Sequence, residues 1–300
     1  MAEPLRILCL HGYTQSGPQF SNKTGALRKA LTAALAPRIV ELHYPTGPLA
    51  LRAEDIPGYS AAVAADAPAS TLPAANTPVS ATTNASTKEE LEAYGWWRRQ
   101  PHPPPSSNSS SATSTYTGLD STFALLSEAI QQHGPFDGVL GFSQGACLAA
   151  MLCSLLDERV RRGEAEVALR REEEEAAARG QEEAFASQRD ASTTEFPASF
   201  LQENGEAIQR PLKFAVLFAG FKAPGRIWGQ VIGVRSLHVL GGLDVVVDEG
   251  RSRELIDVFR EEGREVLVHP GGHFVPSAKV WTGAVTSFVR RCLDNESKDV

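Results

Sequence analysis

The feature that most constrains the fold is the run Gly141-Phe142-Ser143-Gln144-Gly145, which has the form G-x-S-x-G. The apolar run before it, residues 136–140, is typical of a buried strand, and the apolar run after it, residues 146–156, is typical of a helix. Small residues are needed beside the serine of such a turn, because strand and helix approach closely there. The pattern therefore predicts a serine hydroxyl exposed at a sheet edge, beside a helix N-terminus whose dipole favours an anion.

Strand-like and helix-like runs alternate over most of the chain. Strands are predicted at 5–10, 38–44, 136–140, 214–219, 236–240 and 264–268, and helices at 25–35, 119–132, 146–156, 248–262 and 276–292. Such alternation favours parallel strands joined by right-handed crossovers. We therefore predict an α/β fold, a single domain over residues 1–300 with a mostly parallel central sheet of about six strands flanked by helices.

Three segments interrupt this alternation, at about 55–90, 101–115 and 160–210. The first two are rich in Ala, Ser, Thr and Pro, and the third contains a stretch dense in Glu, Arg and Ala. Low-complexity composition of this kind buries too little apolar surface to offset the entropy of ordering. We predict mobile inserts there, with a solvated helix at 159–189. A partner-binding acidic face at 160–190 is the alternative.

Composition and motifs exclude several classes of function. The net charge of −7 provides no basic surface for nucleic acid. No apolar run reaches the roughly 18 residues of a membrane span, and the N-terminus lacks the basic region of a signal peptide. Four scattered cysteines without a C-x-x-C pattern indicate free thiols in a reducing compartment. No metal cluster, P-loop or G-x-G-x-x-G motif is present, so we expect no cofactor and no metal.

A serine hydroxyl is a poor nucleophile at neutral pH and needs a base that is itself oriented by an acid. Asp244 follows a predicted strand in a Gly-rich turn, and His273 follows the last predicted strand in a loop that contains two glycines. The carboxyl ends of parallel strands share one edge of a sheet, where active sites form. The sequence therefore predicts that Ser143, Asp244 and His273 meet there as a catalytic triad.

Each partner of the serine has an alternative. Asp248 competes with Asp244, although its position before a predicted helix favours an N-cap. His269 competes with His273, although its place at the end of a strand favours a packed, structural ring. We favour Asp244 and His273 because both lie in loops that can project over the sheet edge. They also follow Ser143 in the chain order Ser, acid, His.

The tetrahedral intermediate of acyl transfer needs N–H donors for its oxyanion. We predict that one donor is the backbone N–H of Gln144, the residue after the serine. The other is expected from the loop after the first strand, with Tyr13 as first choice and Thr14 as second. His11, in the same loop, is expected to support the loop rather than to take part in the chemistry.

Several motifs, in the same order along the chain, resemble the family of serine hydrolases. They are Leu8-Cys9-Leu10-His11-Gly12-Tyr13, Lys23-Thr24-Gly25-Ala26-Leu27-Arg28-Lys29, Tyr44-Pro45-Thr46-Gly47-Pro48, Gly95-Trp96-Trp97, the run from Gly134 to Ala146, and His269-Pro270-Gly271-Gly272-His273-Phe274-Val275-Pro276. The resemblance spans the chain except for the inserts. It implies an α/β-hydrolase fold without a large cap domain, and carboxylesterase or thioesterase activity in the cytoplasm or nucleus.

The resemblance also implies roles for particular residues and a range of substrates. The family triad corresponds to Ser143, Asp244 and His273. The aromatic island, residues 91–99 between the first two inserts, contains Trp96 and Trp97 and corresponds to a lining of the acyl pocket. The alternative is that both tryptophans anchor the island on the core. Some fungal members release polyketide chains from synthases in secondary metabolism, which makes an acyl chain on a carrier protein one form of the expected ester or thioester substrate.

We therefore expect a metal-free serine hydrolase that works through an acyl-enzyme. An acyltransferase that uses the same acyl-enzyme, with an alcohol or amine in place of water, is the alternative enzyme. A non-catalytic binding or scaffold protein is the alternative outside enzymes, since a fold does not fix a function.

Overall fold

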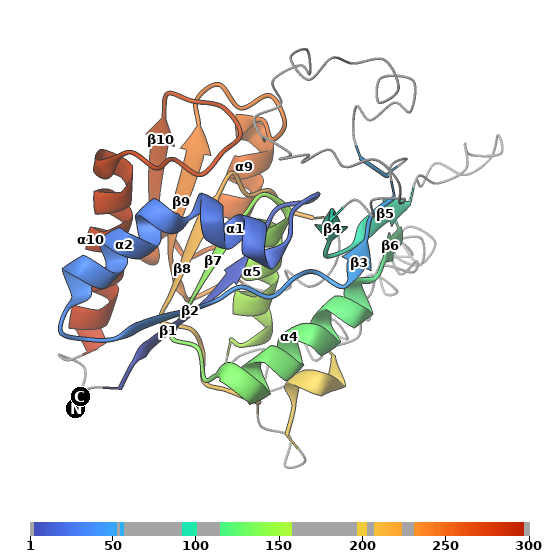
Figure 1. Ribbon diagram of the computed structural model, residues 1–300, viewed down its shortest axis with the longest axis horizontal. Coiled ribbons are helices and arrows are strands. Elements are labelled where there is room, and N and C mark those ends of the chain that lie inside the picture. Colours follow the sequence, from blue (N-terminus) through green and yellow to red (C-terminus); the bar gives the residue numbers. More distant parts are fainter. Residues whose placement is uncertain are drawn as a thin grey trace, which may run out of the picture.

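A six-stranded parallel sheet forms the centre of the molecule (Figure 1). The computed structural model describes residues 3–52, 55–56, 92–100, 115–157, 197–202, 207–223 and 231–296. The strands of the sheet are β1 (Leu5–Leu10), β2 (Val40–His43), β7 (Gly138–Phe142), β8 (Phe214–Phe218), β9 (Arg235–Gly241) and β10 (Arg264–His269), and they lie in the order β10-β9-β8-β7-β1-β2. The predicted α/β fold with a parallel sheet is confirmed.

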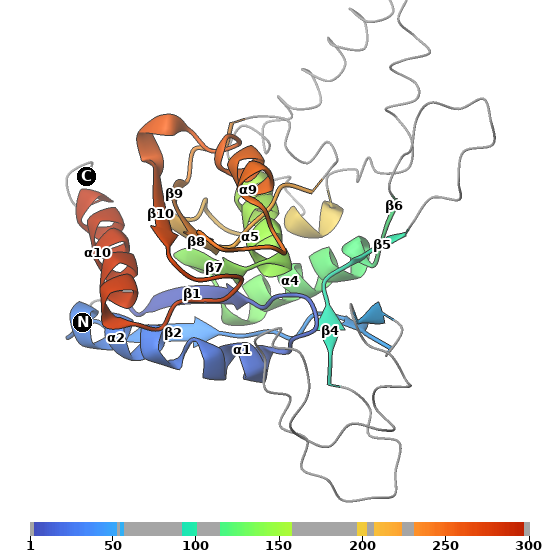
Figure 2. The ribbon, with the colours of Figure 1, turned by 90° about the horizontal axis from the view of Figure 1, so that it is seen from above.

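Helices cover both faces of this sheet (Figure 2). Alternate residues of β1 mark the two faces, because successive side chains of a strand point to opposite sides. The helices are α1 (Gly17–Lys23), α2 (Gly25–Leu35), α4 (Leu119–His133), α5 (Gln144–Leu155), α9 (Glu249–Ile256) and α10 (Lys279–Glu296). Ile7 and Cys9 pack with α1, α2 and α10, whereas Leu8 and Leu10 pack with α4, α5 and α9.

Two short antiparallel pairings lie outside the main sheet. They join β3 (Leu49–Ala50) to β4 (Tyr94–Gly95) and β5 (Arg98–Gln100) to β6 (Thr115–Thr117). The aromatic island lies within them and is also tied to the loop after β1, since Thr14 N–H donates to Tyr94 O at 2.8 Å. These pairings join distant segments, and the sequence pattern did not predict them.

Several boundaries differ from the predicted ones. Helix α1 was not predicted, although Ser16 and Gln19 form a capping box at its start and Pro18 occupies its first turn. Strand β7 lies two residues later than predicted, at 138–142 instead of 136–140. Helix α10 begins at Lys279, so Pro276 precedes the helix and is not in its first turn.

The predicted inserts are only partly covered by the described residues. The predicted helix at 159–189 lies outside them, as do nearly all of 55–90 and 101–115. Residues 197–202 and 207–210, which were assigned to the third insert, pack against the core. The Phe200 ring is fully buried 6.1 Å from the ring of Phe123, and Gln209 Oε1 accepts the Phe136 N–H at 2.9 Å. This end of the segment therefore belongs to the core.

All four cysteines are free and buried, as expected. In the part of the chain that the structure describes, none of the helices combines the length and apolar character needed to cross a membrane.

Candidate active site

Ser143 stands at the tight turn between β7 and α5. Its φ of 53° and ψ of −116° place it in a backbone region that residues with a side chain rarely adopt. Such strain persists where the surroundings enforce it. A Cβ on Gly145 would overlap the carbonyl oxygens of Leu10 and His11, and a Cβ on Gly141 would overlap Gly145 O. The two glycines of the motif thus allow the close approach of strand and helix that holds the serine in this turn.

The structure brings the three residues of the predicted triad together. His273 Nε2 lies 3.0 Å from Ser143 Oγ, and His273 Nδ1 lies 2.7 Å from Asp244 Oδ2. The Asp244 side chain is 4% exposed and the His273 side chain 18%, so the acid is shielded while the imidazole stays accessible. The His273 ring rests against Phe142, with 4.9 Å between centroids. Hydrogen bonds therefore run without a break from serine to acid.

The loop that follows β9 fixes the Asp244 carboxylate. Its Oδ1 accepts the backbone N–H groups of Val246 and Val247, each at 2.9 Å, which leaves Oδ2 for His273. Backbone bonds also tie this loop to the one after β10, since Leu243 N–H donates to Gly271 O at 3.0 Å. The acid and the histidine are thus positioned by two linked loops.

The two alternative residues occupy structural positions. Asp248 Oδ1 accepts the Arg251 N–H at 3.1 Å and is the N-cap of α9. The His269 ring is buried, its Nδ1 accepts the Gly271 N–H at 3.2 Å, and it packs 4.9 Å from the Phe274 ring. Burial lowers the pKa of His269. Neither residue forms a hydrogen bond with Ser143, whose Oγ is paired with His273 Nε2 instead.

Two backbone N–H groups are candidates for the donors to an oxyanion. Gln144 is the first residue of α5, and the first amides of a helix have no partner within the helix. In the loop after β1, Thr14 N–H is already used by Tyr94 O, whereas no described residue accepts from Tyr13 N–H. Among the described residues the geometry therefore favours Tyr13 over Thr14 as the second donor.

His11 supports this loop through both ring nitrogens. Nδ1 donates to Gly12 O at 2.8 Å, and Nε2 accepts the Gly47 N–H at 2.9 Å. Burial lowers the pKa of His11 to about 4, against a weaker opposing effect of the backbone bond to Gly12. The ring is therefore neutral near pH 7, and its hydrogen bonds leave it no part in proton transfer.

Trp96 and Trp97 are buried, with 0% and 3% of their surface exposed. The Trp96 indole N–H donates to His11 O at 2.8 Å. The Gln144 side chain holds the backbone of both, because its Oε1 accepts the Trp96 N–H at 2.9 Å and its Nε2 donates to Trp97 O at 2.8 Å. The tryptophans thus anchor the island on the core, and their lining of an acyl pocket stays a prediction. Sequence reasoning did not anticipate this role of the Gln144 side chain.

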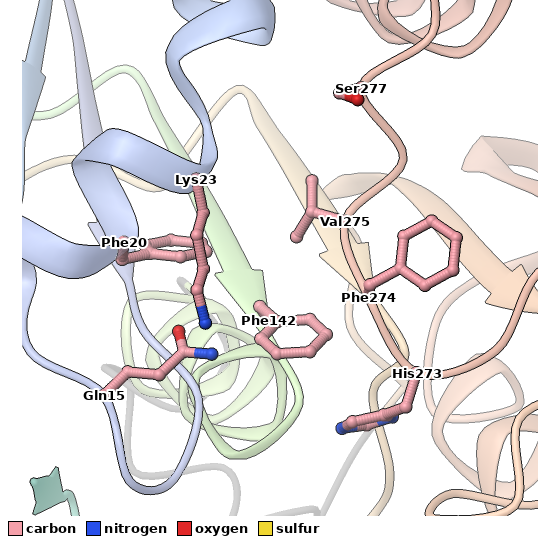
Figure 3. Close-up of a pocket in the computed structure, with 8 residues that line it drawn as sticks. All are labelled: Gln15, Phe20, Lys23, Phe142, His273, Phe274, Val275 and Ser277. Atoms are coloured by element: carbon pink, nitrogen blue, oxygen red, sulfur yellow. The ribbon is translucent and has the colours of Figure 1, made fainter. Parts of the chain in front are cut away.

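A pocket of about 250 Å³ opens beside His273 (Figure 3). Its lining comes from α1, the loop before it, the end of β7 and the loop after β10, and comprises Gln15, Phe20, Lys23, Phe142, His273, Phe274, Val275 and Ser277. Of these, sequence reasoning identified only His273, although the capping box of α1 signals the helix that carries Phe20 and Lys23. Within the described residues, no group of three His, Cys, Asp or Glu side chains is arranged to hold a metal.

A parallel sheet with a serine at a strained turn and a histidine and an acid in loops at the same edge defines the α/β-hydrolase class. The chain belongs to the family whose model is described as Serine hydrolase (FSH1), which matches residues 1–285.

Named relatives agree with this family assignment, and a solved structure agrees with the fold. The chain is 30% identical over 295 residues to "Esterase OVCA2" of Danio rerio, covering 97% of this chain and 98% of that one. It is 29% identical over 303 residues to "Family of serine hydrolases 3" of Saccharomyces cerevisiae, covering 100% and 88%. The crystal structure of Zea mays acyl-protein thioesterase 2 is 14% identical, with a TM-score of 0.50 over 98% of this chain and 95% of that one, and shares the fold. The protein is an ester hydrolase of the serine type.

Proposed function

We propose that the protein cleaves carboxylic esters or thioesters through a Ser143-His273-Asp244 triad and an acyl-enzyme. The observation that carries this proposal is the unbroken pair of hydrogen bonds, 3.0 Å from Ser143 Oγ to His273 Nε2 and 2.7 Å from His273 Nδ1 to Asp244 Oδ2. Asp244 accepts the Nδ1 proton of a neutral imidazole. Nε2 is then the basic nitrogen, directed at the serine hydroxyl.

In the first half of the reaction, Ser143 Oγ bonds to the substrate carbonyl carbon while its proton moves to His273 Nε2. The carbonyl oxygen becomes an oxyanion that accepts hydrogen bonds from the N–H groups of Tyr13 and Gln144. The bond from the carbonyl carbon to the leaving oxygen or sulfur then breaks, and the leaving group takes the proton from Nε2. An alcohol or thiol departs, and the acyl group stays on Ser143.

In the second half, water attacks the acyl-enzyme and gives one proton to His273 Nε2. Collapse of the second tetrahedral intermediate returns that proton to Ser143 Oγ and releases the carboxylic acid. Asp244 stabilises the imidazolium in both halves without itself being protonated. No step needs a metal or an organic cofactor.

The family resemblance supports a wide range of acyl groups, from small-molecule esters to an acyl or polyketide chain bound as a thioester to a carrier protein. It equally supports a site of action in the cytoplasm or nucleus. An acyltransferase differs only in the acceptor that attacks the acyl-enzyme, so product analysis with and without an added alcohol separates the two activities.

The test is hydrolysis of a series of 4-nitrophenyl esters and acyl thioesters by the wild type and by Ser143→Ala. Loss of the nucleophile should lower kcat by a factor on the order of 10⁶ while the fold is kept. Ser287→Ala, an exposed serine of α10, is the matched control and should retain full activity. Esterase activity of wild-type magnitude in folded Ser143→Ala would show that Ser143 is not the nucleophile.

A further inference from the structure

The pocket beside His273 has nitrogen donors on one side and apolar walls on the other. Lys23, the last residue of α1, directs its ammonium group into the pocket next to the amide of Gln15 (Figure 3). The rings of Phe20 and Phe142 and the side chain of Val275 provide apolar surface around them. Two donors at the end of an apolar space are suited to an oxygen anion on an aliphatic chain.

The Gln15 amide is held in place by the oxyanion loop. Its side chain belongs to a residue that is only 6% exposed, and Oε1 accepts the Gly12 N–H at 3.4 Å. The backbone of Gln15 is fixed as well, since its O accepts the Tyr94 N–H at 3.2 Å. Among the described residues nothing accepts a hydrogen bond from Gln15 Nε2. The amide of a largely buried residue is therefore oriented at the pocket, and its Nε2 is left for a group that enters the pocket.

Lys23 has no acidic partner in the part of the chain that is described. Lys23 is exposed overall and no carboxylate there lies within ion-pair distance of its Nζ, although desolvation by the surrounding protein lowers the pKa of the ammonium group. An ammonium group at the edge of a pocket, with no carboxylate beside it, can pair with an anion that enters the pocket. The negative end of the α1 dipole and packing of the lysine stem also favour a cation here. The helix dipole and the packing of the stem do not explain why the Nε2 donor of Gln15 lies in the same pocket.

We propose that Lys23 and Gln15 bind a second carboxylate of the substrate, one that is not part of the scissile bond. The enzyme then prefers monoesters and monothioesters that carry a free acid group over neutral analogues of the same length. This inference rests on the proposed function, because it assigns the pocket beside His273 to the substrate of Ser143. The carboxylate is carried either by the acyl part or by the leaving group, and the experiment separates the two.

The experiment measures kcat/KM of the wild type and of each Lys variant named below, using matched charged and neutral substrates. In the first arm the acyl part differs, glutaryl against pentanoyl thioester. In the second arm the leaving group differs. The acetyl ester of 4-hydroxybenzoate, which is charged, is compared with the acetyl ester of methyl 4-hydroxybenzoate, which is neutral. Lys23→Met removes the charge at similar size, Lys23→Arg keeps it, and Lys29→Met, on an exposed lysine of α2, is the matched control.

A charge-assisted hydrogen bond contributes roughly 1.5–3 kcal/mol, so Lys23→Met should lower the ratio of charged to neutral kcat/KM by about 10- to 100-fold in one arm. Lys23→Arg should keep a preference for the charged substrate, and Lys29→Met should leave the ratio unchanged. The preference of the wild type should weaken as salt is added. Thermal unfolding of each variant detects a folding defect. Lys23→Gln is a second neutral variant, which tests the effect of the charge if Lys23→Met does not fold.

A wild type without preference in either arm overturns the inference, as does a ratio that is the same in folded Lys23→Met or Lys23→Gln. Both results leave the proposed function standing, provided that turnover of the neutral substrates still depends on Ser143. Turnover that persists in Ser143→Ala is the separate result that removes the proposed function itself.

Discussion

Gln144 Oε1 accepts a hydrogen bond from the backbone N–H of Trp96 at 2.9 Å, across 48 residues of sequence. The other end of the same amide donates to Trp97 O at 2.8 Å. Gln144 follows Ser143 directly, and its backbone N–H is also the proposed oxyanion donor. One residue therefore joins the strained turn at Ser143 to the aromatic island, and the island in turn bonds to the loop of the second proposed donor through His11 O.

Replacing Gln144 with alanine should destabilise the protein while sparing the backbone N–H that we propose as an oxyanion donor. Two buried groups, Trp96 N–H and Trp97 C=O, lose their partners, and each unsatisfied buried group costs about 1–3 kcal/mol. The free energy of unfolding from urea titration should fall accordingly. Gln132→Ala, which removes only an exposed bond to Glu128, should change it by less than about 0.5 kcal/mol. Equal effects of the two substitutions would contradict the bridging role of Gln144.

Asp244→Asn should lower kcat by about 10⁴ with little change in stability. An asparagine amide at this place donates to His273 Nδ1, so the imidazole proton moves to Nε2, which can then no longer accept from Ser143. Steady-state hydrolysis measures the loss.

Asp248→Ala is the matched comparison for Asp244→Asn. Asp248 caps α9, so its loss should cost about 1 kcal/mol of unfolding free energy and leave kcat close to that of the wild type. The reverse outcome, an inactive Asp248→Ala and an active Asp244→Asn, would assign the acid to Asp248.

Gly145→Ala should be strongly destabilising or fail to fold, because the new methyl group would overlap the backbone of Leu10 and His11. Backbone oxygens in a packed sheet cannot move aside as a flexible side chain can. Gly283→Ala offers the opposite case, because Gly283 lies within α10 and has open space where a Cβ would be. Alanine is also favoured over glycine in a helix by about 1 kcal/mol. Thermal unfolding should show a large loss for Gly145→Ala and a small gain for Gly283→Ala. A Gly145→Ala protein as stable as the wild type would contradict the described packing.

Acid should destabilise the fold through two buried histidines. Burial, with a smaller effect of Arg264, lowers the pKa of His238 from 6.5 to about 3, and burial lowers that of His11 to about 4. Between these values and 6.5 the unfolded chain binds more protons, so the free energy of unfolding falls as pH falls through this window. Each histidine contributes up to about 1.4 kcal/mol per pH unit.

His238→Gln should therefore reduce the pH slope of stability between pH 4 and 6 by one proton, as measured by urea titration at several pH values. His11 remains and keeps its own share of the slope. An unchanged slope, or a midpoint near 6.5 for the His238 ring in an NMR titration of the folded protein, would contradict the predicted destabilisation.

Elements that depend on local pattern were predicted well. Helix α2 occupies Gly25–Leu35 as predicted, because Leu27 and Leu31 lie on one face and pack on the sheet. Helix α9, in contrast, ends at Ile256 and not at residue 262. The chain leaves the helix to pair with Ile232, whose N–H donates to Val258 O at 2.7 Å. A contact between distant segments of this kind leaves no trace in the periodicity of the sequence.

The same distinction holds for the site. Ser143, Asp244 and His273 each follow a strand, and parallel strands bring their carboxyl ends to one edge, so local signals sufficed to place them together. Gln15 also follows a strand, in the loop between β1 and α1, but a glutamine there carries no signal of a role in the site. Lys23 reaches the pocket from the far end of α1, and nothing in the local sequence marks it as a neighbour of His273.

Labelling with a fluorophosphonate, followed by mass spectrometry of the modified peptide, tests the central claim most directly. The reagent bonds covalently to a serine that a neighbouring base activates. The account predicts one adduct, on Ser143, in the folded wild type, almost none in Ser143→Ala, and much slower labelling in Asp244→Asn. Labelling of another residue, or none at all in folded wild type, would contradict an activated Ser143.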